Sequence, residues 1–137
     1  MPSKIDLSRL ISELEKQGSC KLAQLPLRKE LLVPESEVKD ISKVLKQLSE
    51  PSKLKILLLL YYNNSLPVCI ISRALGLDQT LVSHHLKTLK ASGLVEYKRI
   101  GKYKLYKLTN YTAKIAHIIL ETLLKQAPPC GGKAEEQ

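Results

Sequence analysis

The chain has 137 residues, of which 44% are hydrophobic and 26% are charged, as in an ordinary globular domain. This length allows one domain, or one domain with appended helices. No apolar run approaches the roughly 20 residues that span a bilayer, and charged residues follow the start of the chain where a signal peptide would be hydrophobic. These features argue against a membrane or secreted protein. Three cysteines without a secretory signal indicate reduced thiols in the cytoplasm.

The net charge of +9 is concentrated in one part of the sequence. Residues 79–108 contain seven Lys and Arg residues and a single Glu, so this segment holds six of the nine net positive charges. Because a solvated surface normally mixes the two signs, the segment favours nucleic acid as a partner. Charge alone would also suit an acidic protein or a membrane surface.

Residues 1–37 predict a helical extension. Ser3 and Asp6 resemble a capping box, and an apolar stripe at helical spacing follows them. We therefore expect a helix over residues 3–17 that a glycine ends. Residues 19–34 are expected to be irregular, or to form a short helix broken by a proline. The stripe consists of Leu7, Leu10, Ile11 and Leu14.

Four helices are predicted between residues 35 and 92. Three of these helices begin at or just after a proline, because the proline ring suits the first turn of a helix. The prolines are Pro34, Pro51 and Pro67. Asp78 is a good N-cap for the fourth, over residues 79–92. Only a tight turn around a glycine separates the third helix from the fourth, which is the pattern of a helix–turn–helix. The first of the four has an apolar stripe of Val38, Ile41, Leu45 and Leu48.

Two strand-like segments come next, at residues 94–100 and 103–108. They are rich in Tyr, Val, Ile and Leu, and Gly101-Lys102 separates them, which predicts a β-hairpin with a basic tip. A helix–turn–helix followed by a basic hairpin is a winged helix. The predicted fold is therefore mainly α with a small β-hairpin. It is a winged helix–turn–helix domain over residues 38–126, with N- and C-terminal dimerisation helices and a disordered tail at 127–137.

The last predicted helix, over residues 111–126, is apolar around most of its circumference. Its polar residues fall on one narrow stripe, so we expect it to be buried on two sides. The winged domain can cover one side, and a second copy of the chain is the simplest cover for the other. The N-terminal apolar stripe also lacks a partner, and both features predict a homodimer. The expected interface consists of Leu7, Leu10, Leu14, Ile115, Ile118, Ile119 and Leu123.

Several motifs resemble the ArsR/SmtB family of regulators, in the order in which that family has them. Residues 48–60, LSEPSKLKILLLL, are similar to the family's Leu-Ala-Asp-Pro-Thr-Arg-Leu-Arg-Ile-Leu. The similarity continues through residues 75–89 (LGLDQTLVSHHLKTL), 92–95 (SGLV) and 99–108 (RIGKYKLYKL). It covers about residues 38–126. The resemblance implies a homodimeric winged-helix transcription regulator, usually a repressor that an inducer releases from its operator.

The residue chemistry agrees with this resemblance on the helix at 79–92 and on the hairpin. Val82, Leu86 and Leu89 are expected to pack inward, and His85 is interpreted as structural. Polar side chains near the helix start would read base edges, while hairpin cations and a tyrosine hydroxyl would contact phosphates. Each lysine could equally be a solvated surface residue. The expected contacts are Gln79, Thr80, Ser83, His84, Lys87, Lys98, Arg99, Lys102, Tyr103 and Lys104. A two-fold protein predicts an inverted repeat in the double-stranded site.

The metal ligands of the family are largely missing from this chain. The family's thiolate motif, Glu-Leu-Cys-Val-Cys-Asp-Leu, aligns with residues 65–71, which keep only Cys69. One thiolate is too few for arsenite or a soft divalent ion, so we interpret Cys69 as a small buried apolar residue. His117 and Glu121 are interpreted as part of an exposed ion-pair stripe. We therefore expect no metal and no cofactor. The family's zinc positions fall on the poor ligands Asn110, Thr112, Leu123 and Gln126.

Other functions remain open. Cys20 could join Cys69 across a dimer, as in family members that bring an N-terminal cysteine to the motif helix, and so form a thiol- or metalloid-responsive repressor. A small basic winged dimer could instead coat DNA with weak specificity, as a chromatin-like protein, or serve as a protein-interaction module. No catalytic set, phosphate-binding glycine loop or Cys-x-x-Cys motif is present, so we do not expect an enzyme.

Overall fold

The computed structural model describes residues 2–18, 22 and 24–125. The disordered tail predicted at 127–137 lies outside the described residues. The chain divides into two compact units, Met1–Leu45 and Lys46–Gln137. In the described part of the chain, no helix combines the length and the apolarity that crossing a membrane requires.

The N-terminal unit is built on an antiparallel ribbon of two strands, β1 (Ser3–Asp6) and β2 (Glu30–Val33). Helix α1 (Leu7–Lys16) follows β1, and its N-cap Asp6 accepts a 3.0 Å hydrogen bond from the Ser8 backbone N–H. The prediction of a helix from residue 3 was therefore wrong, as was the irregular or helical structure predicted for residues 30–33. Both errors have one cause, since each strand is stabilised by pairing with the other, and the pattern of one segment does not reveal a distant partner.

Helix α2 (Glu35–Ser49) begins with the two acidic residues expected in its first turn. A 2.7 Å hydrogen bond from the Ser36 hydroxyl lowers the pKa of the Glu37 carboxyl. The predicted apolar stripe is present, but Val38, Ile41 and Leu45 are 56%, 55% and 56% exposed, and among the residues of α2 only Leu48 is buried. A row of large apolar side chains this exposed is typical of a surface that a partner covers.

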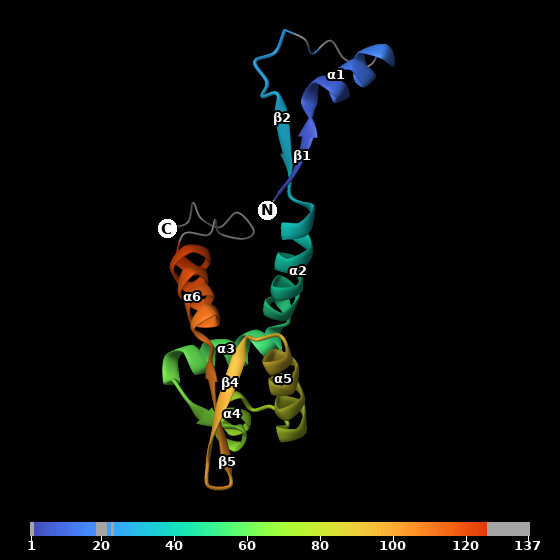
Figure 1. Ribbon diagram of the computed structural model, residues 1–137. Helices are drawn as coiled ribbons and strands as arrows, with labels where there is room; N and C mark the ends of the chain where they lie inside the picture. The colour runs from blue at the N-terminus through green and yellow to red at the C-terminus, as the bar shows by residue number, and fades with distance from the viewer. Residues whose placement is uncertain (1, 19–21, 23, 126–137) are drawn as a thin grey trace. The chain divides into compact units, whose positions relative to one another are not determined.

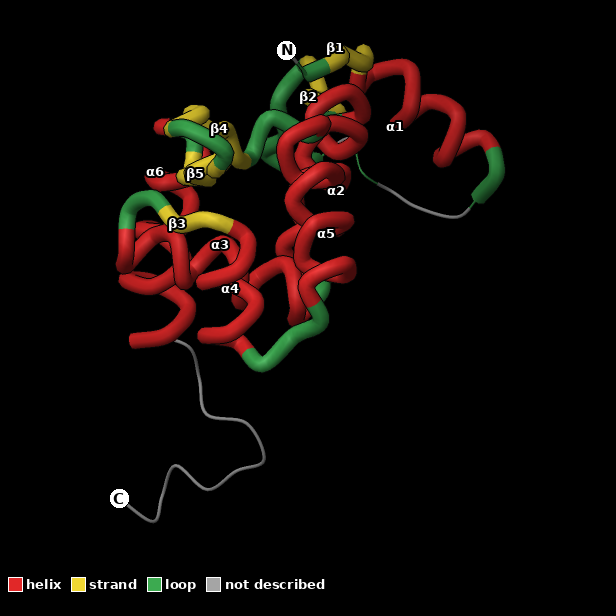
Figure 2. The backbone as a smooth tube through the Cα atoms, turned by 90° about the horizontal axis from the view of Figure 1, so that it is seen from below, coloured by secondary structure: helices red, strands yellow, loops and turns green. Residues whose placement is uncertain are grey.

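In the described residues, the C-terminal unit contains five helical segments after α2 and three strands. Figure 1 shows the helices α3 to α6 and the hairpin of β4 and β5. The strands form one antiparallel sheet in the order β3–β5–β4. Figure 2 shows α4 beside β3, and α4 also packs against α3. In chain order the elements are α3 (Pro51–Asn63), β3 (Leu66–Pro67), α4 (Val68–Leu75), α5 (Gln79–Ala91), β4 (Val95–Ile100), β5 (Tyr103–Leu108), α6 (Asn110–Ile118) and the π-helical η1 (Ile119–Leu124).

The turn between α4 and α5 confirms the predicted helix–turn–helix. Gly76 adopts the left-handed conformation, with φ of 64°, which ends α4 at a position that favours glycine. The Asp78 carboxylate then caps α5 by accepting a 3.1 Å hydrogen bond from the Leu81 backbone N–H. The hairpin of β4 and β5 is also as predicted, and we call it, with its turn at Gly101, the wing.

The core of this unit fixes the orientation of α5. Side chains from α3, α4, α5 and the start of the wing are buried together, and they hold one face of α5 inward. Tyr106 on β5 is buried as well, which raises the pKa of its hydroxyl. The almost completely buried apolar residues include Ile56, Leu57, Leu60, Ile71, Val82, Leu86, Leu89, Leu94 and Val95.

Strand β3 was not predicted. Leu66 pairs with Tyr106 and Pro67 with Leu105, so Pro67 is the N-cap of α4 rather than its first residue. An edge strand tolerates proline because the missing N–H can fall on the side that makes no ladder hydrogen bond.

The last predicted helix is α-helical only as far as Ile118 and continues as η1. Thr109 caps α6, because its hydroxyl accepts from the Thr112 backbone N–H at 3.4 Å and donates to the Gly93 carbonyl at 3.0 Å. Thr112 and Ala116 are buried, whereas Ile118 and Leu123 are exposed. Within one chain the segment is therefore covered on one side only.

Candidate nucleic-acid interface

Helix α5 presents a polar face near its N-terminal end. Val82, Leu86 and Leu89 are buried, as expected for the inward face. Gln79, Thr80, His84 and Lys87 are exposed and Ser83 is half-buried, so the residues expected to contact DNA lie on the outer surface. No acidic residue occupies the first turn of α5, where the backbone N–H groups give the helix end a partial positive charge.

His85 lies on the inward side of the same helix, as expected for a structural residue. Its Nε2 is 3.7 Å from a carboxylate oxygen of Glu50, and the other oxygen of Glu50 is 3.1 Å from the Lys53 ammonium. Among the described atoms, the buried Nδ1 of His85 has no hydrogen-bond partner. These contacts connect α5 to the start of α3 and keep the His85 side chain on the buried face of α5.

The wing carries its cations on both strands and at the turn. Lys98, Arg99 and Lys102 are exposed, and Lys104 is half-buried. The strand register places Arg99 opposite Lys104 and Ile100 opposite Tyr103. Neighbouring positive charges on a thin hairpin repel one another, so the arrangement favours an anionic partner that neutralises them.

Tyr97 was not singled out from the sequence, although it organises two lysines. The Lys104 ammonium lies 4.8 Å from the centre of the Tyr97 ring, and the Lys90 ammonium lies 5.3 Å from it. The ring also packs against Tyr106, with centroids 5.3 Å apart. Cation–π contacts of this kind hold the lysine side chains against the wing. The only signal that the sequence offered is an aromatic residue in a strand, directly before the basic pair Lys98 and Arg99.

A hollow of about 280 Å³ brings the start of α5 together with the wing. Gln79 lines it from the helix, and Lys102, Tyr103 and Lys104 line it from the wing. The remaining walls come from the first residues of α4 and from its N-cap, at residues 67–69. We call this the wing–helix hollow. Four of the residues expected to contact DNA thus share one concave surface, although Gln79 and the three wing residues are more than twenty positions apart in the sequence.

Cys69 is exposed, so its interpretation as a buried apolar residue was wrong. The core position of α4 belongs to Ile71. Because residues two apart on an α-helix are about 200° apart around the axis, Cys69 points away from that core. Cys20, the other proposed sensor thiol, lies outside the described residues. Among the described residues, no three His, Cys, Asp or Glu side chains gather as a metal ion would require.

The residues that align with the family's zinc ligands do not lie together around one point that could hold a metal ion, as far as the structure describes them. Thr112 is buried and bonded to Thr109, and Leu123 is an exposed apolar residue, while Gln126 lies outside the described residues. Glu121 forms an ion pair with Lys125 at 3.2 Å, whereas the His117 ring is 3.1 Å from the Tyr61 hydroxyl. His117 and Glu121 are thus engaged with different partners.

The expected dimer residues carry apolar surface in the single chain. Leu7, Leu10, Ile115 and Ile119 are half-buried, while Leu14, Ile118 and Leu123 are exposed. The exposed stripe of α2 was not included in the expected interface. Its helical spacing was visible in the sequence, but spacing alone does not distinguish a stripe that packs within the chain from one that stays exposed.

The bacterial regulatory protein model of the arsR family matches residues 50–97. The regulator NmtR of Mycobacterium tuberculosis is 36% identical over 84 residues, which are 61% of this chain and 68% of NmtR. A homolog of the cadmium resistance regulator CadC from Staphylococcus aureus is 33% identical over 75 residues, 55% of this chain; the chain spans 62% of that protein.

A solved structure is also similar. It is the homodimeric winged helix–turn–helix DNA-binding domain of Mb0332 from Mycobacterium bovis, described as a possible ArsR-family transcriptional regulator. Its TM-score is 0.58 at 28% identity, and the match covers 73% of this chain and 88% of that domain.

Proposed function

This chain belongs to the arsR family of bacterial regulatory proteins, and we propose that it acts there as a homodimeric repressor that binds double-stranded DNA through α5 and the wing. As a family member it is a winged helix–turn–helix transcriptional regulator and not an enzyme. The main support for the proposed DNA surface is the wing–helix hollow, which Gln79 of α5 and three wing residues line together. A regulator works where the DNA is, so we place it in the cytoplasm.

The outer face of α5 supports sequence-specific binding. A Gln side chain can pair with adenine through two hydrogen bonds, and Ser and Thr hydroxyls can bond to base edges or phosphates. In this proposal Gln79, Thr80, Ser83 and His84 enter the major groove, with Lys87 at the backbone. The four side chains proposed to enter the groove are exposed or half-buried and lie on the first half of the helix, which is the part that a recognition helix presents to bases.

The wing supports affinity rather than sequence preference. A lysine or arginine that neutralises a phosphate releases bound counterions, and this effect does not depend on base identity. We propose phosphate contacts from Lys98, Arg99, Lys102 and Lys104, with a hydroxyl contact from Tyr103.

The exposed apolar side chains of α6 and η1 support a homodimer. Ile118 and Leu123 lie in water in the single chain, and a second copy of the same segment would cover them. Ile115 and Ile119 would join them, with α1 contributing Leu7, Leu10 and Leu14. A two-fold dimer would present two copies of α5, so the operator is proposed to be an inverted repeat with half-sites about one helical turn apart or more.

Competition binding separates this function from that of a weakly specific DNA-coating protein. DNA fragments are first selected from a random pool with the protein, and their binding is then compared with random duplexes at one fixed salt concentration. A specific regulator should prefer its selected site by about 10³ or more. A preference near unity, with no sequence enriched, would support the coating protein instead.

A further inference from the structure

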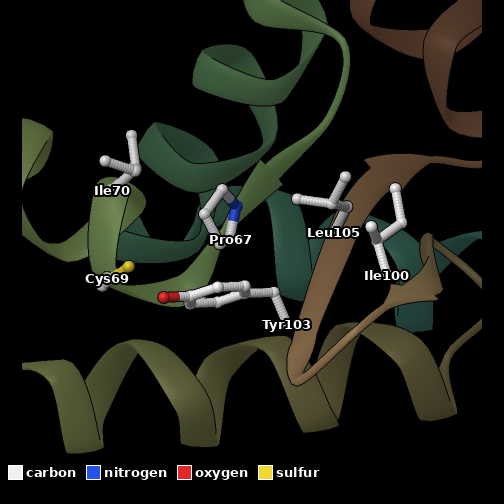
Figure 3. Close-up of a pocket in the computed structure, with 6 residues that line it drawn as sticks. All are labelled: Pro67, Cys69, Ile70, Ile100, Tyr103 and Leu105. Atoms are coloured by element: carbon white, nitrogen blue, oxygen red, sulfur yellow. The ribbon is translucent and has the colours of Figure 1, made fainter.

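A second concave surface adjoins the wing–helix hollow and is apolar. It has a volume of about 320 Å³ and is lined by Pro67, Cys69, Ile70, Ile100, Tyr103 and Leu105. We call it the wing groove. Figure 3 shows Tyr103 extending from the wing toward Cys69 at the start of α4, with Pro67 beside its ring and with Leu105 and Ile100 on the wing side.

The wing groove exposes more apolar surface than a DNA-binding face requires. Ile70, Ile100 and Tyr103 are 49%, 52% and 50% exposed. Exposing large apolar side chains to water is unfavourable, and a cluster of them is typical of a site that a ligand covers. The sugar-phosphate backbone is polar and anionic, so it matches the lysines of the wing and the Tyr103 hydroxyl, but not the two isoleucines or the ring of Tyr103.

The two concave surfaces share three lining residues and differ in character. Both are lined by Pro67, Cys69 and Tyr103, and the wing–helix hollow adds the cations Lys102 and Lys104. None of the described residues that line either surface is acidic, and neither lysine has an ion-pair partner among the described residues. An apolar groove beside a hollow that two lysines line is complementary to a molecule with an apolar body and an anionic end.

We infer that the wing groove and the wing–helix hollow together bind an amphipathic organic anion, namely an aromatic or branched carboxylate. The groove is at the small end of the usual size range for ligand sites, so the apolar body has one or two rings. Its carboxylate lies at Lys102 and Lys104. Ligand binding itself does not depend on the proposed function.

The consequence for regulation follows from the shared residues and does rest on the proposed function. A ligand in this position covers side chains that are proposed to contact DNA, namely Gln79, Lys102, Tyr103 and Lys104. The ligand and DNA therefore exclude each other, and the ligand is an effector that releases the repressor. By mass action, a ligand at ten times its Kd lowers the apparent DNA affinity about tenfold.

The first experiment measures binding of naphthoate to the free protein by calorimetry, with naphthalenemethanol as the neutral molecule of matching shape. Naphthoate is expected to bind, and the alcohol to bind about fivefold more weakly, because it lacks the charge that Lys102 and Lys104 meet. Equal binding of the two molecules, or no binding of naphthoate at millimolar concentration, would overturn the inference.

Matched variants then locate the site. Ile100→Ser and Ile70→Ser should each weaken naphthoate binding about fivefold or more, while Leu25→Ser, which removes an equally exposed leucine elsewhere, should leave it unchanged.

A second pair of variants tests the charge. Lys102→Ala should weaken naphthoate binding, whereas Lys107→Ala, on the same strand pair but in an ion pair with Glu96, should not. Unchanged binding in the Ile100→Ser and Lys102→Ala variants would overturn the inference. So would a change of oligomeric state in Ile100→Ser, because the groove would then be covered by a second chain.

The last step titrates naphthoate against the complex with selected DNA. Release of DNA by naphthoate but not by naphthalenemethanol is the expected result. Naphthoate that binds the free protein yet leaves the DNA complex intact would overturn the effector role. If the protein alone binds no DNA, the proposed function fails, and the calorimetry still decides the ligand site.

Discussion

Gln79 and Lys102 line the same hollow, yet they are expected to contribute to DNA binding in different ways. A Gln amide recognises the pattern of donors and acceptors on a base edge, which depends on sequence. A Lys ammonium interacts with the phosphate charge, which every sequence has. Replacing each by alanine therefore separates the two kinds of contact.

We predict that Lys102→Ala weakens binding to selected and random duplexes by the same factor and lowers the slope of log K against log salt by roughly one. Gln79→Ala should instead reduce the preference for the selected site, by about 1–3 kcal/mol, and leave the slope unchanged. Fluorescence anisotropy over a series of salt concentrations measures both quantities. If the two variants behave alike on both duplexes, the assignment of base and phosphate contacts is wrong.

Burial of individual side chains was predicted well where the sequence pattern was regular. The inward positions of Val82 and Leu86 follow from the spacing along α5, and both are buried. Cys69 was misjudged because α4 is short and its first residues face the wing, which the spacing within α4 does not reveal.

Asp78 illustrates how one residue determines where an element begins. Its carboxylate accepts the hydrogen bond from Leu81 that satisfies a free backbone N–H at the start of α5. Without the Asp78 carboxylate, the Leu81 N–H in the first turn of α5 loses its hydrogen-bond acceptor, which water replaces only in part.

We predict that Asp78→Ala lowers the free energy of unfolding by about 1 kcal/mol, because the cap is lost. Asp78→Asn should remain within about 0.5 kcal/mol of the parent, since an asparagine side chain also caps helices. Urea denaturation monitored by circular dichroism measures the difference. Equal destabilisation by the two substitutions would show that the charge of Asp78, rather than its hydrogen bond, stabilises the helix.

The strands show the limit of prediction at the scale of an element. The wing was predicted because its two strands are adjacent in sequence and joined by a turn containing glycine. Strands β1, β2 and β3 were not, since each pairs with a segment far away in the chain. Strand propensity depends on such neighbours more than helix propensity does.

At the scale of the whole molecule, the exposed apolar side chains of α6 and η1 predict the oligomeric state. We expect Ile119→Asp to yield monomers that no longer bind DNA, because a buried carboxylate would be left unpaired in the dimer interface. Leu123→Asp should act in the same way, and its 61% exposure means that folding of the single chain tolerates it. Tyr62→Asp, at a residue 67% exposed outside the proposed interface, is the control. Sedimentation of the parent protein as a monomer at micromolar concentration would contradict the dimer.

The response to metals is a second property of the whole molecule. We predict that stoichiometric zinc, cadmium or arsenite does not release the protein from DNA, because a switch needs ligands that bind one conformation better than the other. Cys69 is exposed, and the other two cysteines, Cys20 and Cys130, lie outside the described residues. The thiol-responsive alternative takes its second thiolate from Cys20 of a second copy of the chain. Arsenite is therefore titrated against the DNA complexes of the parent and of Cys20→Ser. Release of the parent but not of the variant would establish the thiol-responsive alternative.

The sequence by itself determined the helices α2 to α5, the helix–turn–helix and the wing, together with the basic segment that they carry. These features follow from local physics, namely the spacing of apolar residues, the caps at Gly76 and Asp78, and the turn at Gly101. The family resemblance also rests on motifs that are continuous in the chain.

The tertiary structure alone decided which residues meet. It paired β1 with β2 and β3 with β5, exposed Cys69, held Lys90 and Lys104 over Tyr97, and brought Gln79 to the same hollow as Lys102. Each of these outcomes depends on contacts between segments that are separated in sequence. Such contacts form when the chain packs its apolar residues into one core, and no pattern within a single segment encodes them.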